Sequence, residues 1–173
     1  MNISITPYDK GQYNEVVDLA KEIITEVYGR EPNKDSVFDV LTLNSDSCVY
    51  SNDNKGVLLV VSINNKVIGM GGLRKLNSMP DVADTYMDHF TNPKYTGIIA
   101  RVYIKSDYRR LGIGKKIYQR LLDAAKMFSY SHLYLNATRI PPLATYWEQF
   151  GFQEFDHEDD YYQTTHMILE IGL

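Results

Sequence analysis

A short run of glycines and cations near the middle of the chain combines residue types that bind phosphate. Backbone N–H groups at the start of a helix have no partner inside the helix, and the helix dipole adds partial positive charge there. Glycine lets the backbone come close to a ligand, and arginine and lysine supply charge. We therefore predict a pyrophosphate pocket at a helix start, formed by Arg109, Arg110, Leu111, Gly112, Ile113, Gly114 and Lys115.

Two common phosphate-binding loops do not fit these residues. A Walker A loop ends in Gly-Lys-Ser/Thr, but Lys115 is followed by Lys116. A dinucleotide-binding fingerprint has a third glycine three residues after the second, and Ile117 occupies that position. The pattern that remains is Arg-x-x-Gly-x-Gly, from Arg109 to Gly114.

The elements on either side of this pattern would hold it in place. An apolar strand from Ile98 to Ile104 leads into it, and an amphipathic helix follows. Apolar residues recur at helical spacing along one face of that helix, at Ile113, Ile117, Leu121, Ala124 and Phe128. Packing of this face on a sheet would aim the N-terminus of the helix at the ligand.

Periodicity and turn signals outline the other elements. Asn64-Asn65 separates two runs rich in Val, Ile and Leu and predicts a hairpin. The segment 77–96 has no clear period, so we expect either a disordered excursion or a loop near the acceptor site. Helices are predicted over 12–28, 34–43 and 143–150, and strands over 3–8, 57–63, 67–75, 132–136, 152–155 and 162–170. This order predicts a mixed α/β sheet with helices on its faces.

The pattern from Arg109 to Gly114 resembles the acetyl-CoA signature of the GNAT N-acetyltransferases, Gln/Arg-x-x-Gly-x-Gly/Ala. The stretch from Tyr146 to Phe152 resembles the Leu-Tyr-x-x-x-Gly-Phe stretch of that family, and residues 162–169 resemble its last strand. The resemblance covers nearly the whole chain. It implies one domain over residues 1–173, with a mixed, mostly antiparallel sheet of six or seven strands and about four helices on its faces.

The resemblance also implies a reaction. Members of the family transfer an acetyl group directly from acetyl-CoA to an amine, and the strand before the motif pairs with the pantetheine arm of CoA like an added strand. The matching positions are Val102, Tyr103 and Ile104, and a β-bulge would splay this strand from its neighbour. Asn136 would hydrogen-bond the CoA arm or be an ordinary amide at a strand end. We therefore expect an acetyl-CoA-dependent N-acetyltransferase acting on a primary amine of a small molecule, a peptide or a protein.

The catalytic groups depart from the family pattern. The family's tyrosine acid falls on Trp147, whose indole N–H is not a practical proton donor. Tyr146 lies one residue earlier, about 100° around a helix, and is our candidate acid, the alternative being a packing role. Trp147 would line the cofactor channel or pack in the core. Ile98 occupies the place of the glutamate base that some members carry, and Arg101 would bind an anion in the acceptor pocket or extend to the surface.

Composition limits the partners and the location. The 173 residues are 44% hydrophobic and carry a net charge of −4, which argues against general binding of nucleic acid. Cys48 is the single cysteine, so a disulfide within the chain is impossible. The polar start and the lack of a long apolar run predict a cytoplasmic protein without a membrane anchor, as a monomer or homodimer. The 4 histidines are scattered, so we expect no metal site.

Two further interpretations stay open at this level. A catalytically weak acyl-CoA-binding sensor or regulatory module of the same fold would also lack a clear base. The acidic residues Asp156, Glu158, Asp159 and Asp160 would form a solvated loop or attract a cationic acceptor by electrostatic steering. The identity of the acceptor amine therefore does not follow from the sequence.

Overall fold

A seven-stranded sheet forms the centre of the protein in a computed structural model that describes residues 2–90, 93–139, 143–158 and 163–172. The strand order is β1-β2-β3-β4-β5-β7-β6, in which β4 and β5 run parallel and the other neighbours run antiparallel. The mixed, mostly antiparallel sheet expected from the sequence is thus confirmed. The strands are β1 (Ile3–Pro7), β2 (Val57–Ile63), β3 (Lys66–Lys75), β4 (Thr96–Ile104), β5 (His132–Thr138), β6 (Gln153–Glu158) and β7 (Thr164–Glu170).

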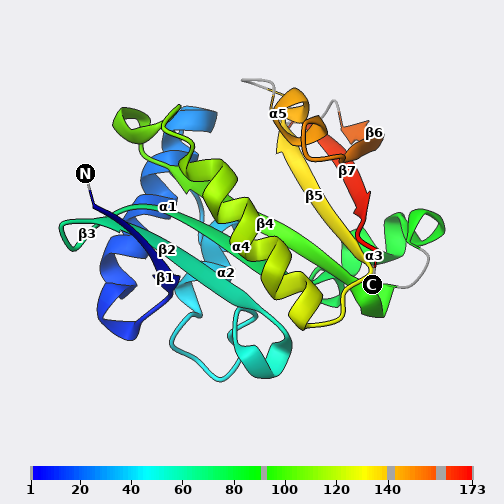
Figure 1. Ribbon diagram of the computed structural model, residues 1–173, viewed down its shortest axis with the longest axis horizontal. Helices are drawn as coiled ribbons and strands as arrows, with labels where there is room; N and C mark the ends of the chain where they lie inside the picture. The colour runs from blue at the N-terminus through cyan, green and yellow to red at the C-terminus, as the bar shows by residue number, and fades with distance from the viewer. Residues whose placement is uncertain (1, 91–92, 140–142, 159–162, 173) are drawn as a thin grey trace.

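Helices cover both faces of this sheet. In Figure 1, α4 crosses in front of the central strands and α1 lies behind them. Two separate apolar clusters agree with this arrangement, one between the sheet and α4 and α5, the other between the sheet and α1 and α2. The helices are α1 (Tyr13–Tyr28), α2 (Phe38–Leu41), α3 (Pro80–Thr85), α4 (Ile113–Met127) and α5 (Ala144–Glu148). In the described part of the chain, no helix is long and apolar enough to cross a bilayer.

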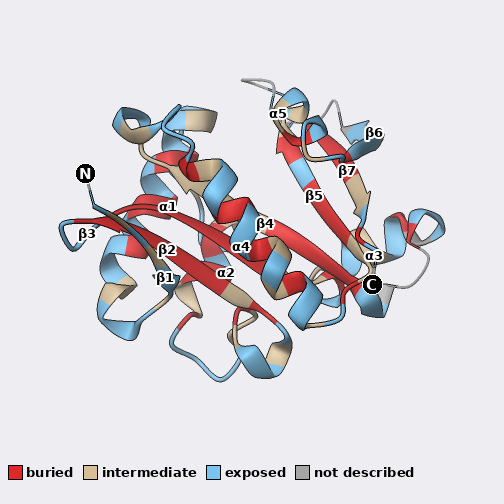
Figure 2. Ribbon diagram, viewed as in Figure 1, coloured by how far each residue is buried: buried red, intermediate tan, exposed pale blue. Residues whose placement is uncertain are grey.

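The α4 helix shows why the sequence places it on the sheet. Its buried residues are Ile113, Ile117, Tyr118, Leu121 and Ala125, so the buried face is turned slightly from the predicted one, which had Ala124 and Phe128 at its edge. Figure 2 shows the inward side of α4 and the central strands as buried and the outward side of α4 as exposed. Gly71 of β3 makes this close packing possible, because a β-carbon there would lie 2.3 Å from the Ile117 side chain.

The predicted hairpin between β2 and β3 is confirmed. Ile63 pairs with Lys66 across a two-residue turn. Asn64 and Asn65 adopt φ values of 49° and 63°, the left-handed region that asparagine tolerates better than most residues. The two asparagines therefore set the turn that joins β2 to β3, and the register shifts once further along, between Val61 and Ser62.

Other segments differ from their predicted form. The predicted helix 34–43 is a 3₁₀ turn, Asp35–Val37, followed by the single turn of α2. In the segment 77–96, Tyr86 and Phe90 are 8% and 3% exposed, so its described residues are anchored in a small core rather than disordered. The acidic residues near the end of the chain do not form a loop throughout, because Asp156 and Glu158 lie within β6. Asp159 and Asp160 lie outside the described residues.

Candidate functional site

The strands β4 and β5 diverge at the middle of the sheet. They are paired only from Thr96 to Ile98 on β4 and from His132 to Tyr134 on β5. Beyond these residues the two strands separate, as Figure 1 shows, where β4 passes behind α4 and β5 runs to the right of that helix. From Ile99 onward, the edge of β4 that faces β5 has no strand partner among the described residues. An extended ligand could therefore pair with this edge as an added strand.

A β-bulge interrupts β4 where the strands have separated. Gly72 pairs with Ala100 and Met70 pairs with Tyr103, so two residues of β4 lie opposite Gly71 alone. One of these two residues is Arg101, which adopts a left-handed φ of 57°. The bulge expected from the sequence is therefore confirmed, although the pattern alone did not say which residue would carry it.

The bulge decides which backbone groups face the open side. The Lys105 N–H donates to the Ile68 carbonyl at 2.9 Å, and backbone groups in an antiparallel ladder point alternately toward and away from the partner strand. Tyr103, paired with Met70, therefore directs its N–H and C=O toward β3. By the same alternation, the N–H and C=O groups of Val102 and Ile104 point toward the open side. The three predicted pantetheine-binding positions thus divide into two that face the opening and one that faces β3.

The loop after β4 leads into an uncapped helix. Gly112 is the N-cap of α4 with a left-handed φ of 74°, and no side chain caps the helix start. A β-carbon on Gly112 would meet no atom within 4 Å, so the N-terminus of α4 is open there. Leu111 is exposed, whereas the side chain of Ile113 is buried and leaves its backbone N–H to serve a ligand. The amides of this first turn could therefore accept an anion, as the sequence predicts.

The cations of this loop have different surroundings. The guanidinium of Arg109 binds Glu26 of α1 with two N···O distances of 2.5 and 2.7 Å, and its Nε donates to the Ile104 carbonyl at 2.9 Å. The hydrogen bond from Arg109 lowers the pKa of Glu26. Arg110 and Lys115 are exposed and have no ion pair among the described residues. Arg109 therefore braces the loop against α1, while Arg110 and Lys115 are available to a phosphate.

Tyr146 faces the start of α4. A β-carbon added to Gly114 would lie 2.5 Å from the Tyr146 hydroxyl and 3.6 Å from Cδ1 of Ile104. The hydroxyl is buried and has no hydrogen-bond partner among the described residues. Burial raises the pKa of Tyr146, so the phenol keeps its proton at neutral pH. A buried donor without a partner therefore lies where β4, α4 and α5 meet.

Trp147 and Asn136, two further predicted contacts of the cofactor, differ in their surroundings. Trp147 is 6% exposed and packs edge-on against Tyr118 and Phe152, with ring centroids 6.1 and 5.7 Å apart. It is a core residue in this structure, which favours the packing role over a contact with the cofactor. Asn136 is exposed on β5, two residues beyond Tyr134, where pairing with β4 has ended. Its position is compatible with a ligand held between the two strands.

Arg101 takes neither of the two roles considered from the sequence. Its side chain extends neither to the surface nor toward a ligand, but binds the carboxylate of Asp39 through Nε at 3.1 Å and Nη2 at 2.7 Å. Sequence reasoning missed Asp39. The signal was a carboxylate between apolar residues, at the centre of the run from Val37 to Leu41, matched by an equally unusual cation in an apolar strand.

Position 98, where some members of the family carry a glutamate base, holds an apolar side chain. Ile98 is buried in an apolar cluster beside Tyr134. The Tyr134 hydroxyl is 2.7 Å from Nδ1 of His166, and this pair is also buried. No group of three or more His, Cys, Asp or Glu side chains that could hold a metal ion occurs among the residues that the structure describes.

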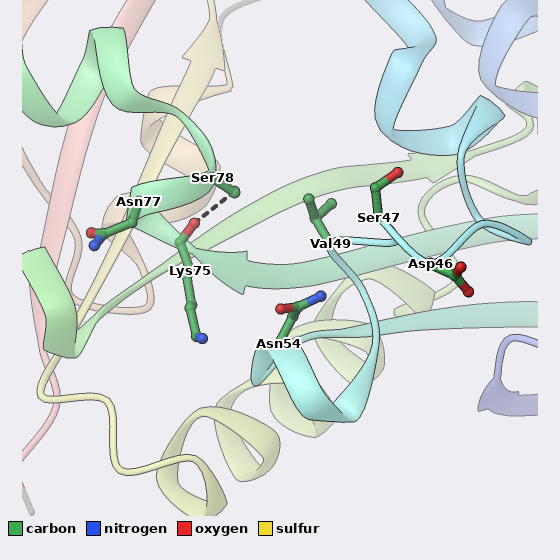
Figure 3. A pocket seen from close by; sticks show the side chains of 7 residues that line it. All are labelled: Asp46, Ser47, Val49, Asn54, Lys75, Asn77 and Ser78. Carbon is green, nitrogen blue, oxygen red and sulfur yellow. Dashed lines mark hydrogen bonds between the residues drawn. The ribbon is translucent and has the colours of Figure 1, made fainter.

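A polar cavity of about 380 Å³ lies at the other end of β3, and Figure 3 shows its lining side chains. They are Asp46, Ser47, Val49, Asn54, Lys75, Asn77 and Ser78. Lys75 pairs with Gly97, whereas Gly69 pairs with Ile104, so the cavity lies roughly 20 Å along the strand from the end of β4 that leads into the phosphate loop. It contains none of the predicted site residues and is not part of the candidate site.

Comparison with known proteins places the chain in a family. The model of the acetyltransferase (GNAT) family matches residues 14–152. An uncharacterised N-acetyltransferase of Dictyostelium discoideum is 37% identical over 57 residues, which are 32% of this chain and 26% of that protein. The chain thus matches about a quarter of the length of this curated relative.

Solved structures share the fold over almost the whole chain. A GNAT acetyltransferase of Staphylococcus aureus Mu50 has a TM-score of 0.75 at 17% identity, covering 98% of this chain and 99% of that one. The PaiA N-acetyltransferase of Thermoplasma acidophilum, solved with coenzyme A, has a TM-score of 0.70 at 16% identity, covering 99% and 100%. The YncA protein of Salmonella typhimurium, solved with its cofactor acetyl-CoA, has a TM-score of 0.71 at 16% identity, covering 100% and 96%. By its family match, its sheet and its Arg-x-x-Gly-x-Gly loop, this chain belongs to the GNAT acetyltransferase family.

Proposed function

We propose that this protein is an acetyl-CoA-dependent N-acetyltransferase that moves an acetyl group to a primary amine. The observation that carries the proposal is the buried, unpartnered hydroxyl of Tyr146 beside Gly114 at the start of α4. A buried donor without a partner costs free energy in the protein alone and is satisfied by a ligand acceptor. Its neighbours are an uncapped helix N-terminus and an unpaired strand edge, which suit the two ends of the CoA arm.

The described residues fit CoA in order along the opening. The pyrophosphate would lie on the first-turn amides of α4, with Arg110 and Lys115 beside it. The pantetheine arm would pair with the free edge at Val102 and Ile104, and Asn136 on β5 would bond its amide groups. Two structural neighbours were solved with CoA or acetyl-CoA, which supports CoA as the ligand.

Acetyl-CoA supplies an activated acetyl thioester, so the chain needs no nucleophilic side chain of its own. A fixed backbone N–H on the free edge of β4 would donate to the thioester oxygen, where negative charge develops as the amine attacks. The Tyr146 hydroxyl would donate its proton toward the sulfur of the leaving thiolate. Holding the amine and the thioester together supplies much of the remaining rate enhancement.

Removal of the proton from the amine falls to solvent in this proposal. Ile98 is apolar and buried, so no carboxylate occupies the position of the family's glutamate. A chain of water molecules from bulk solvent can accept the proton. The acceptor class, a primary amine of a small molecule, a peptide or a protein, stays a prediction, as do the single domain over residues 1–173 and the cytoplasmic location.

The alternative of a weak acyl-CoA sensor is not favoured. A sensor needs the phosphate loop and the strand edge but has no use for a proton donor at the sulfur. The buried, unpartnered Tyr146 hydroxyl would be available for that role, which supports the enzyme. The presence of Ile98 at the position of the family's base is equally compatible with both functions, so it does not separate them.

Two measurements test the proposed function. Isothermal titration of the wild-type protein with CoA and with ATP should show binding of CoA and much weaker binding of ATP, since only CoA carries the pantetheine arm. Release of free thiol from acetyl-CoA, followed on a panel of primary amines, should show turnover with at least one amine class. Tight CoA binding without thiol release on any amine would favour the sensor, and preferential binding of ATP would contradict the site.

A further inference from the structure

A buried ion pair fastens the bulge of β4 to α2. The guanidinium of Arg101 donates to both carboxylate oxygens of Asp39, at 3.1 and 2.7 Å, and to the Ser36 carbonyl at 2.6 Å. The side chains of Arg101 and Asp39 are 16% and 6% exposed. A fourth hydrogen bond joins Nη1 of Arg101 to the Tyr103 hydroxyl at 3.1 Å. The bulge residue is thus bonded on every side of its guanidinium fork.

The carboxylate of Asp39 is held from other directions as well. The Tyr50 hydroxyl donates to Oδ2 of Asp39 at 2.6 Å, and Nη1 of Arg74 lies 3.9 Å from the same oxygen. Tyr50 reaches it across Gly72, where a β-carbon would lie 2.4 Å from the tyrosine ring. Gly72 is the partner of Ala100, the residue just before the bulge. The absence of a side chain on the facing strand therefore lets this network form beside the bulge.

The conformation of Arg101 is costly without such a network. Its φ of 57° lies in the left-handed region, which disfavours residues with a β-carbon. Ala100 packs against the apolar cluster of the 76–90 segment, and Arg101 bonds to Asp39 of α2. Val102 packs on the face of the sheet that α4 covers. In a strand without the bulge, alternation would send the side chain at 101 into the apolar core under α4. A charged guanidinium would not be tolerated there unpaired.

The same one-residue shift governs the ligand edge. With the bulge, Val102 and Ile104 direct their N–H groups to the open side, and Tyr103 is paired with Met70. Without the bulge, the alternation would reverse, and Tyr103 would face the opening instead. The position of the backbone donor for the thioester therefore depends on the extra residue at 101.

We propose that the Asp39–Arg101 ion pair is a positioning device, which holds the β4 bulge in register so that the backbone N–H groups of Val102 and Ile104 face the acetyl thioester. This inference rests on the proposed function. Asp39 touches neither substrate nor the reacting atoms in this scheme. It acts through Arg101, from α2, on a strand edge that it does not itself contact.

The first test compares Asp39→Asn with a matched control, Glu22→Gln. Glu22 also holds a cation next to the end of β4, because it pairs with Lys105 at 2.6 Å, but that pair is exposed and lies outside the bulge. Asp39→Asn should lower kcat by roughly tenfold or more, and the loss should exceed the loss of affinity for CoA. Glu22→Gln should leave both quantities within about twofold of wild type.

An infrared measurement follows the position of the donor directly. Acetyl-CoA labelled with ¹³C at the carbonyl, bound without an acceptor, should show a lowered carbonyl stretching frequency in wild type and in Glu22→Gln, because a fixed N–H donates to that oxygen. In Asp39→Asn the frequency should return toward its value in water. A merely structural role for Asp39 would lower the melting temperature without moving this frequency in the folded protein.

A pair of double variants isolates the backbone at position 101. Asp39→Asn with Arg101→Gly and Asp39→Asn with Arg101→Ala both remove the two buried charges, which protects folding. Glycine adopts a φ of 57° at little cost, whereas alanine does not. The glycine double variant should therefore keep more of the carbonyl shift and a higher kcat than the alanine double variant, by roughly threefold or more.

The outcomes separate this inference from the proposed function. If wild-type protein binds CoA and turns over an amine while Asp39→Asn keeps the full kcat and the carbonyl shift, the positioning role is wrong and the enzyme assignment stands. Equal kcat and equal carbonyl frequency in the two double variants would also overturn it. Wild-type protein that binds no CoA and shifts no carbonyl would overturn the proposed function, and the positioning role with it.

Discussion

The hydroxyl of Tyr146 lies directly against Gly114 in the first turn of α4, so close that a β-carbon at position 114 would come within 2.5 Å of it. One residue belongs to a short helix near the end of the chain and the other to the phosphate loop in the middle. Their contact places a proton donor at the entrance of the opening between β4 and β5. It also gives the second glycine of the loop a role distinct from that of the first.

Replacement of Tyr146 by phenylalanine should lower kcat by roughly 10²- to 10⁴-fold if the phenol is the acid. The ring is kept, so CoA affinity should stay close to that of wild type. Because burial raises the pKa of Tyr146 above its ordinary value of 10.0, its ionisation should limit the wild-type rate only at pH values above 10. Thiol release measured across pH checks both points. Full activity of Tyr146→Phe would remove Tyr146 from the mechanism.

Gly114→Ala should reduce turnover by displacing the Tyr146 hydroxyl, although alanine favours the helix by about 1 kcal/mol over glycine. In a Tyr146→Phe background the obstructing oxygen is gone, and the next ring atom would be at an ordinary 3.4 Å. The alanine should then cost little further activity. A double-mutant cycle on kcat measures this coupling. Independent, additive effects of the two changes would contradict the contact.

Gly112→Asp should weaken CoA binding by roughly tenfold or more, which corresponds to about 1.4 kcal/mol. The reason is charge, because an aspartate at the helix start would repel the pyrophosphate, while its β-carbon would meet no protein atom within 4 Å. Gly112→Asn is the matched control, since asparagine has the same shape and tolerates the φ of 74° comparably. Titration calorimetry with CoA should give a larger loss for Gly112→Asp. Equal affinities of the two variants would place the phosphate elsewhere.

Asp39 should make stability depend on pH in a defined direction. Burial raises the pKa of its carboxyl, but the Arg101 charge and hydrogen bonds outweigh this effect and hold the pKa below 3.8. The free energy of unfolding that Asp39 contributes is therefore fully present above about pH 4, its unfolded-state pKa, and is lost as pH falls through the lower folded-state value. Asp39→Asn should cost roughly 3–5 kcal/mol at neutral pH.

Urea unfolding of wild type and Asp39→Asn at several pH values checks this dependence. The difference in unfolding free energy should be constant above about pH 5 and should shrink below about pH 4. Glu22→Gln, which removes an exposed partner, should change stability by less than about 1 kcal/mol at each pH. A difference between wild type and Asp39→Asn that grows toward acid pH would contradict the lowered pKa.

The features that the sequence predicted well are encoded by neighbouring residues. Two asparagines between β-branched runs define the hairpin turn, and their positive φ values follow from their own chemistry. The stripe of α4 and the glycines before it define where the helix begins. Such signals operate within one or two turns of chain, so no knowledge of the fold is needed to interpret them.

The features that the sequence left open depend on residues far apart. Whether Tyr146 or Trp147 faces the phosphate loop is a rotation of about 100°, and the larger, more apolar Trp147 packs in the core against Phe152. The partner of Arg101 is 62 residues away in the chain, on a helix whose packing fixes the bulge. The bulge in turn selects Val102 and Ile104, and not Tyr103, for the open edge.

The sequence by itself therefore predicted the glycine-rich loop, the helix that follows it and a mixed sheet, because local periodicity and glycine placement are sufficient for these. Only the tertiary structure decided which hydroxyl meets the loop and which amides face the opening. Those choices are made by burial and by a paired charge, and both exist only when distant segments are packed together.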